Sequence, residues 1–142
     1  MSNIETIRQV YAAFARGDID AISSRLSESV AWEAAGTHTD VPWLLSRRGR
    51  DGVRRFFEAG GALQIHSFQP KAFLESDRLV VVLLDEDVTV KATGKRIREF
   101  DQVHIWRFDE QGVVLSHRVR VDTHRHWCAF HDRSCPAASA EC

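Results

Sequence analysis

The segment from Phe100 to Val121 has the pattern of two long β-strands joined by a tight turn, and it constrains the fold more than any other part of the chain. The run Phe100–Phe108 is rich in β-branched and aromatic residues, and Val113–Val121 has a similar composition. Asp109–Gly112 stands between them and is typical of a turn. We therefore expect this hairpin to lie in an antiparallel sheet with one face buried.

Two histidines lie on the arms of the hairpin. A four-residue loop would pair Phe108 with Val113. Counting back along both strands then places His104 directly opposite His117, with both side chains on one face of the sheet. Because imidazole titrates near neutral pH, the pair is a candidate acid/base or hydrogen-bonding site. The alternative is two half-exposed histidines on a solvated face.

Periodic patterns predict helices at the start of the chain and strands after them. Apolar spacing and capping residues indicate helices over residues 4–14, from Asp18 to about residue 26, and from Asp51 to Gly60. The predicted strands cover residues 29–34, 65–74, 79–91, 95–108 and 113–121, with a long loop over 36–49 and a short helix from Asp122 or Thr123 to about His131. This order predicts an α+β fold. We expect one domain over residues 1–142, with its core at about 4–131 and a loose tail over 132–142.

The charge and composition of the chain argue against some classes of binding partner. The 19 basic and 20 acidic residues nearly balance, which argues against nucleic-acid binding. The longest apolar run, Leu79–Leu84, is too short to cross a membrane. The three cysteines all stand at or after Cys128, which is a poor disulfide framework. We therefore expect a cytoplasmic protein with free thiols.

Several segments resemble the nuclear transport factor 2-like superfamily, and within it the SnoaL-like and ketosteroid isomerase-related proteins. The matching segments are Ile7–Ile22, Arg48–Phe57, Ala92–Lys95, Val103–Val114 and Val121–Thr123. The resemblance implies a cone-shaped fold, in which a curved antiparallel sheet wraps around the N-terminal helices and encloses a deep apolar pocket. Members of the superfamily include isomerases, polyketide cyclases, dehydratases and proteins without catalysis.

The catalytic positions of two known relatives fall on other residue types here. The base of ketosteroid isomerase falls on Ala34, its helix-one tyrosine on Val10, and its carboxylic-acid donor on His104. The last-strand acid of limonene epoxide hydrolase falls on Val119. The chain therefore resembles the scaffold without the carboxylates of either reaction. In some SnoaL-like cyclases a histidine on the penultimate strand serves the ligand, and His104 matches that role.

Strand alternation extends the candidate pocket around the two histidines. The candidate catalytic residues are His104, His117 and Glu86, and the candidate substrate-binding residues are Trp32, Trp43, Arg98, Gln102, Trp106 and Val119. Two of these have plain alternatives, since Glu86 belongs to an acidic run and Arg98 suits the solvated rim of a cone. A β-bulge would reverse the alternation beyond it.

The C-terminal segment has four potential metal ligands at helical spacing. They are His124, Cys128, His131 and Cys135. Four ligands along one helical stripe cannot converge on a single ion, so we expect no metal and no other cofactor. Asp122 precedes this segment and suits a helix N-cap better than a catalytic role.

The sequence thus predicts a protein that binds a small apolar organic molecule. The first hypothesis is a cofactor-independent isomerase, cyclase or dehydratase, with His104 as acid/base or donor to a carbonyl, His117 as its partner and Glu86 as a second base. The second is a non-catalytic ligand-binding or dimerisation module of the same fold. In either case a homodimer is expected, because an exposed sheet face in such folds often pairs two chains.

Overall fold

The structure of the protein is a computed structural model that describes residues 1–34 and 39–135. Its elements are α1 (Asn3–Ala15), α2 (Ile19–Ser23), β1 (Leu26–Glu33), the 3₁₀ turn η1 (Pro42–Leu44), β2 (Arg47–Arg48), α3 (Gly49–Gly60), β3 (Leu63–Ser76), β4 (Leu79–Val90), β5 (Arg96–Phe108), β6 (Val114–Arg120) and α4 (Thr123–Phe130). They follow the predicted order, except that η1 and β2 lie in the segment predicted as a loop. The predicted tail beyond Cys135 and residues 36–38 of the predicted loop lie outside the described residues. No helix in the described ranges is long and apolar enough to span a membrane.

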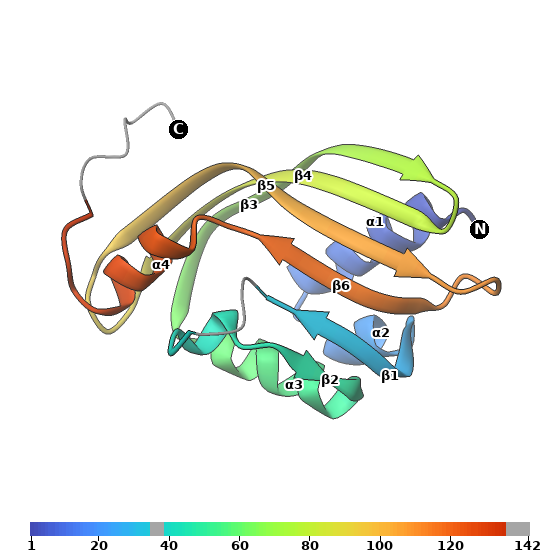
Figure 1. The fold of residues 1–142 in the computed structure, drawn as a ribbon, viewed down its shortest axis with the longest axis horizontal. Coiled ribbons are helices and arrows are strands. Elements are labelled where there is room, and N and C mark those ends of the chain that lie inside the picture. Colours follow the sequence, from blue (N-terminus) through green and yellow to red (C-terminus); the bar gives the residue numbers. More distant parts are fainter. Residues whose placement is uncertain (35–38, 136–142) are drawn as a thin grey trace.

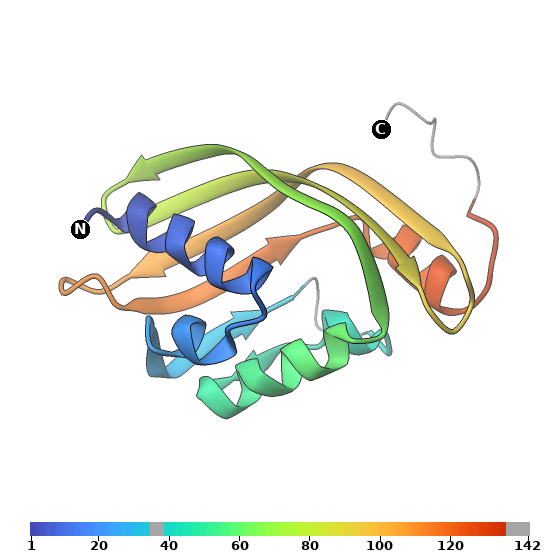
Figure 2. The ribbon, with the colours of Figure 1, turned by 180° about the vertical axis from the view of Figure 1, so that it is seen from behind.

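The six strands form one curved sheet in the order β2-β1-β6-β5-β4-β3. All neighbours are antiparallel except β1 and β6, which run parallel. The long strands bend over the N-terminal helices (Figure 1), and the view from behind shows α1, α2 and α3 on the concave side (Figure 2). Helix α4 lies at one end of the sheet, far from the N-terminus. The expected α+β cone is therefore confirmed.

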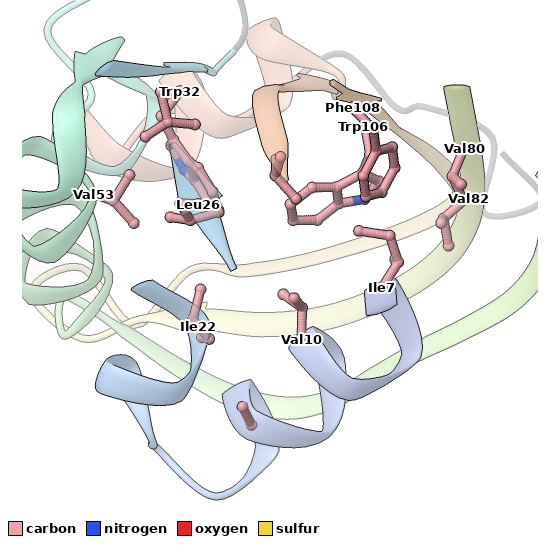
Figure 3. Close-up of a cluster of buried hydrophobic side chains, with 13 residues drawn as sticks. Ile7, Val10, Ile22, Leu26, Trp32, Val53, Val80, Val82, Trp106 and Phe108 are labelled. Atoms are coloured by element: carbon pink, nitrogen blue, oxygen red, sulfur yellow. The ribbon is translucent and has the colours of Figure 1, made fainter. Parts of the chain in front are cut away.

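The main hydrophobic core lies between the helices and the sheet. Figure 3 shows Trp32 and Trp106 on the strands, facing Val10 and Ile22 on the helices. The predicted apolar stripe of α3 also turns inward, since Val53 is fully buried and Phe56 and Phe57 pack against the core. This core includes Trp106 of β5 and Val114 of β6, so its packing positions the two strands that carry the histidines.

Helix α3 begins three residues earlier than the sequence indicated, since Asp51 was expected to cap it. Asp51 is not its N-cap but lies in the first turn, and Arg48 is the capping residue without a side-chain hydrogen bond. The guanidinium of Arg50 donates instead to the carbonyl of Leu26, at 2.8 and 3.2 Å. This bond ties the start of α3 to β1. The carboxylate of Asp51 still interacts favourably with the positive end of the helix dipole.

A bulge in β5 reverses which side chains point inward. Asp101 has a positive φ of 59°, and its N–H donates to the Asp85 carboxylate at 3.1 Å. The register with β4 shifts at this place. As a result, Gln102 and the residues after it keep the predicted orientation, and Glu99 rather than Phe100 is buried.

Candidate functional site

A cavity of about 520 Å³ lies between the concave face of the sheet and the helices. Most of its lining is apolar, with contributions from α1, α3 and five of the strands. Its buried or partly buried polar side chains are Tyr11, Glu86, Gln102, His104, His117 and His126. A few polar groups in a mostly apolar cavity are typical of a small-molecule site.

His104 is held by a chain of two hydrogen bonds from α1 and β5. The indole N–H of Trp106 donates to the Tyr11 hydroxyl at 3.1 Å. The Tyr11 hydroxyl and Nδ1 of His104 form a hydrogen bond at 2.8 Å. We assign the hydroxyl as the donor, because its buried proton would otherwise have no acceptor among its partners in the described residues. In this assignment the proton of the neutral His104 ring is on Nε2. The Nε2–H is the donor that His104 offers to a ligand.

His117 is enclosed by aromatic rings. Its ring centroid lies 3.9 Å from that of Trp106 and 4.2 Å from that of Trp32. The side chain is only 3% exposed. Within the described residues its Nδ1 has no hydrogen-bond partner. An unpaired polar atom in such a place is costly to bury.

The two histidines share one face as predicted, but they are not directly opposite each other. His117 pairs with Trp106, and His104 pairs with Val119. Phe108 pairs with Val114 rather than Val113, and the register shifts by one more residue between Arg107 and Phe108, so the pairing moves by two residues in all. Because side chains alternate with a period of two, this shift leaves both histidines on the concave face. Their ring centroids are 4.9 Å apart, edge to face.

Glu86 belongs to a second polar group in the cavity. Gln102 donates from its amide nitrogen to Glu86 at 2.9 Å and to Glu99 at 3.1 Å. Glu99 also accepts from the Asp122 backbone N–H at 2.8 Å and from His126 Nε2. Trp43 donates its indole N–H to Nδ1 of His126 at 2.8 Å. This bond fixes Nδ1 as an acceptor, so His126 carries its proton on the nitrogen that faces Glu99.

These surroundings shift the pKa values of Glu86 and Glu99 in opposite directions. Burial raises the pKa of Glu86, since it has a single hydrogen bond from Gln102 to offset the loss of water. Burial alone would also raise the pKa of Glu99, but the His126 hydrogen bond, together with those from Asp122 and Gln102, lowers it. Glu99 is therefore the ionised member, and Glu86 is the carboxyl that can exchange a proton.

Burial also sets the protonation of the aromatic polar groups. It lowers the pKa of His104 to about 3. It lowers that of His117 well below the ordinary range as well, with a further contribution from His104. Burial raises the pKa of Tyr11, so its hydroxyl keeps its proton. Both histidines are neutral near pH 7 and serve as dipoles rather than as charges.

Eight of the nine predicted site residues line the cavity, and Arg98 does not. The lining set is Trp32, Trp43, Glu86, Gln102, His104, Trp106, His117 and Val119. Arg98 points outward, with 59% of its side chain exposed, and pairs with Asp87 at 3.3 Å. The Asp101 bulge is the reason, because it reverses the alternation along β5 before that residue. The cavity brings His104 and His117 into contact, whereas Glu86 belongs to the separate Gln102 group.

Three polar residues of the site were missed from the sequence. Tyr11 follows the position where the relatives' tyrosine falls, and its identity as the only tyrosine of the chain was a usable signal. Glu99 points inward because of the bulge in β5, and no turn residue in the sequence predicts that bulge. His126 stands on a helix that pattern alone could not orient. Asp122 caps that helix, as predicted, by accepting from the Arg125 N–H.

Two groups in the described residues bring three potential metal ligands within 4.8 Å of one another. Glu86, Glu99 and His126 form the first, but their atoms are already engaged in the hydrogen bonds above. The second is His124, Cys128 and Cys135. The predicted stripe of four ligands on one helix is wrong, because α4 ends at Phe130 and the chain turns back. His131 Nε2 instead lies 2.8 Å from an Asp40 carboxylate oxygen.

Comparisons with solved structures agree with a nuclear transport factor 2-like (NTF2-like) fold. An NTF2-like protein of unknown function from Burkholderia pseudomallei is 28% identical, with a TM-score of 0.76 over 87% of this chain and 94% of its own. TerC, co-crystallised with polyporic acid, is 26% identical, with a TM-score of 0.72 over 92% and 95%. A protein from Mesorhizobium loti described as a SnoaL-like polyketide cyclase is 17% identical, with a TM-score of 0.68 over 85% and 100%.

The fold and the enclosed cavity define an NTF2-like protein. The sequence model of the SnoaL-like domain matches residues 7–117, which is more than half of the chain. The protein therefore belongs to the SnoaL-like family, as its sequence segments indicated. No match was found among curated proteins.

Proposed function

We propose that the protein binds a small, largely apolar molecule with a carbonyl group and moves a proton on it, as an isomerase, cyclase or dehydratase does. The observation that carries this proposal is a buried carboxyl group, Glu86, in the same apolar cavity as His104. Its raised pKa brings it closer to neutral pH, where a general acid/base works best. No cofactor is needed for this kind of chemistry.

The roles of the polar groups differ in this proposal. Glu86 takes the proton from the carbon next to the carbonyl and returns it at another position. His104, with Nδ1 accepting from Tyr11, donates its Nε2–H to the carbonyl oxygen as negative charge develops there. Histidine in this role stays neutral, which agrees with its lowered pKa. This assignment differs from the sequence-based expectation, in which His104 could itself be the acid/base.

The spacing along β5 suits a substrate of moderate size. Gln102 and His104 are two residues apart on one face, about 7 Å along the strand. Since Glu86 is hydrogen-bonded to Gln102, the donor and the base are separated by roughly the width of a ring or of a few bonds. Trp32, Trp106 and His117 form an aromatic wall for the body of the ligand. Trp43 and Val119 also line the cavity and complete the proposed binding residues.

The relatives support a ligand of this kind. TerC was co-crystallised with polyporic acid, and the Mesorhizobium loti protein is described as a polyketide cyclase. Both names refer to small organic molecules. The proposal for this chain is a carbonyl compound that fills a cavity of about 520 Å³.

A second candidate is a binding protein of the same fold without chemistry. The low pKa values of His104 and His117 favour it, because neither ring can act as a proton donor in its charged form near pH 7. In this case the same donors orient the ligand and Glu86 serves only as a hydrogen-bonding group.

Deuterium exchange distinguishes the two candidates. A panel of apolar ketones and quinones is screened by quenching of tryptophan fluorescence, and bound compounds are then followed by NMR in D₂O for exchange of the protons next to the carbonyl. We expect Glu86→Gln to reduce exchange by at least ~100-fold while binding changes little. Glu75→Gln, an exposed carboxylate on β3, is the matched control and should behave as wild type.

The outcomes separate the proposals. Binding without exchange in the wild type supports the second candidate. Exchange that survives Glu86→Gln contradicts the assignment of the base. If no apolar carbonyl compound binds, both candidates are wrong.

We also propose one cytoplasmic domain that forms a homodimer. Leu74, Phe100 and Leu115 are exposed apolar residues on strands of the sheet, with exposed fractions of 56, 52 and 44%. Exposed apolar side chains of this size favour a second copy of the chain as a partner. A chain that elutes as a monomer in size-exclusion chromatography would contradict the dimer.

A further inference from the structure

We propose that His124, Cys128 and Cys135 form a binding site for a soft or borderline divalent metal ion, with Zn²⁺ as the best match. This proposal is independent of the cavity and of the proposed function. It also departs from the expectation of no metal, which assumed that all four C-terminal ligands lie on one helix. In the structure two ligands are on α4 and the third comes from the segment after it.

The helical pair already has the spacing of two zinc ligands. His124 and Cys128 are four residues apart on α4, and His124 Nε2 lies 3.5 Å from Cys128 Sγ. Tetrahedral zinc with ordinary Zn–N and Zn–S bonds places the two ligand atoms about 3.6 Å apart. No rearrangement of the helix is required to fit an ion between them.

The third ligand is brought back by a turn after the helix. Asp132 has a positive φ of 54°, and the Arg133 N–H donates to the Cys128 carbonyl at 2.8 Å. Cys135 Sγ then lies 3.7 Å from the carbonyl oxygen of His124. All three ligand atoms fall within 4.8 Å of one another, against about 3.8 Å for two thiolates on one zinc ion. A movement of about 1 Å closes the site.

The chemistry of the three ligands selects the metal. Two sulfurs and one imidazole suit zinc, whereas Mg²⁺ and Ca²⁺ prefer oxygen ligands. Zinc binds cysteine as the thiolate, so binding would release protons from the thiols, and affinity should rise with pH. Three protein ligands leave a fourth position for water or another ligand.

The proposed site shares helix α4 with one wall of the cavity. His126 of α4 lines the cavity and bonds to Glu99, while its neighbours His124 and Cys128 hold the ion.

Cobalt titration tests the proposal directly. The full-length protein is treated with a chelator, kept in a phosphine reductant and titrated with Co²⁺, whose thiolate charge-transfer and tetrahedral bands report the ligands. We expect one Co²⁺ per chain, displaced by Zn²⁺. Cys135→Ser should weaken binding by at least ~100-fold, because a direct ligand is lost. His131→Asn is the matched control and should bind as wild type.

Folding is checked in parallel, because Cys128 is buried and Cys128→Ser is less informative. Cys135 is only partly buried and lies after the helix, so Cys135→Ser should keep the fold. Zinc should raise the melting temperature of the wild type and not that of Cys135→Ser. A cobalt spectrum without thiolate bands, equal affinity of wild type and Cys135→Ser, or equal losses for His131→Asn and Cys135→Ser would overturn the site.

Discussion

Lowering the pH from 7 to 5 should cost the folded protein about 4 kcal/mol through two buried histidines alone. In the unfolded chain each imidazole has its ordinary pKa of 6.5 and takes up about 0.7 of a proton over this range. In the folded protein burial lowers the pKa of His104 to about 3, and His117 is also held neutral. The unfolded state therefore binds more protons, so stability falls as the pH falls below 6.5.

The size of the effect follows from the pKa difference. Between pH 7 and pH 5 the protonation free energy of one unfolded imidazole changes by about 2 kcal/mol, while a folded ring that stays neutral gains almost nothing. The result depends only on the folded pKa lying below 5. Two such rings together cost about 4 kcal/mol, which is a large share of the free energy of unfolding of an ordinary domain.

Denaturant unfolding at several pH values measures the loss. The comparison is between the wild type and the double variant His104→Gln/His117→Gln, and the readout is the change with pH rather than the absolute stability. The double variant should lose about 4 kcal/mol less than the wild type on going to pH 5. His66→Gln removes an exposed histidine and should leave the pH dependence as it is. Equal losses in the wild type and the double variant would refute the reasoning.

Three further substitutions test other parts of the site. Tyr11→Phe leaves Trp106 Nε1–H and His104 Nδ1 unpaired in a buried place, and should reduce the free energy of unfolding by about 2–4 kcal/mol in denaturant unfolding. The control is Ser24→Ala, which removes one exposed hydroxyl contact and should change that free energy by less than about 0.5 kcal/mol. Glu86→Gln should raise the melting temperature near pH 7, since the raised pKa of Glu86 makes folding less favourable as the pH rises above the ordinary value of 4.5. An unchanged melting temperature would contradict this. Arg98→Ala should leave ligand affinity within about twofold, because the side chain lies outside the cavity; a tenfold loss in a fluorescence titration would place Arg98 at the site after all.

The sequence predicted the faces of the hairpin more reliably than its register. Turn residues alone suggested that His104 and His117 are directly opposite. A turn one residue longer than predicted and the irregular pairing next to Phe108 together changed this by two residues. An even shift preserves the face, so the histidines still meet in the cavity. The prediction for Arg98 failed because the bulge at Asp101 shifts the alternation by one residue. Asp101 adopts its positive φ with support from Asp85, a contact between strands that no local pattern reveals.

The hydrogen bonds among Glu99, His126 and Trp43 could not be predicted from the sequence for a similar reason. Glu99, His126 and Trp43 are far apart in the chain and meet only because α4 and the η1 turn lie against the same end of the sheet. Capping by Asp122 was predictable because an N-cap depends on neighbouring residues alone. Local interactions could thus be predicted, whereas the partners that set the protonation of Glu99 could not.

The parallel pairing of β1 with β6 has a consequence for the order in which the chain acquires its structure. Strand β1 is synthesised early, but its neighbour in the sheet is one of the last elements to leave the ribosome. The apolar surface of the early helices and β1 therefore stays exposed until β6 has been synthesised. Such exposure slows folding and favours the binding of chaperones. Trp32 meets His117 at 4.2 Å only when β6 arrives. Its fluorescence should consequently report the final step of folding, in which the cavity first exists.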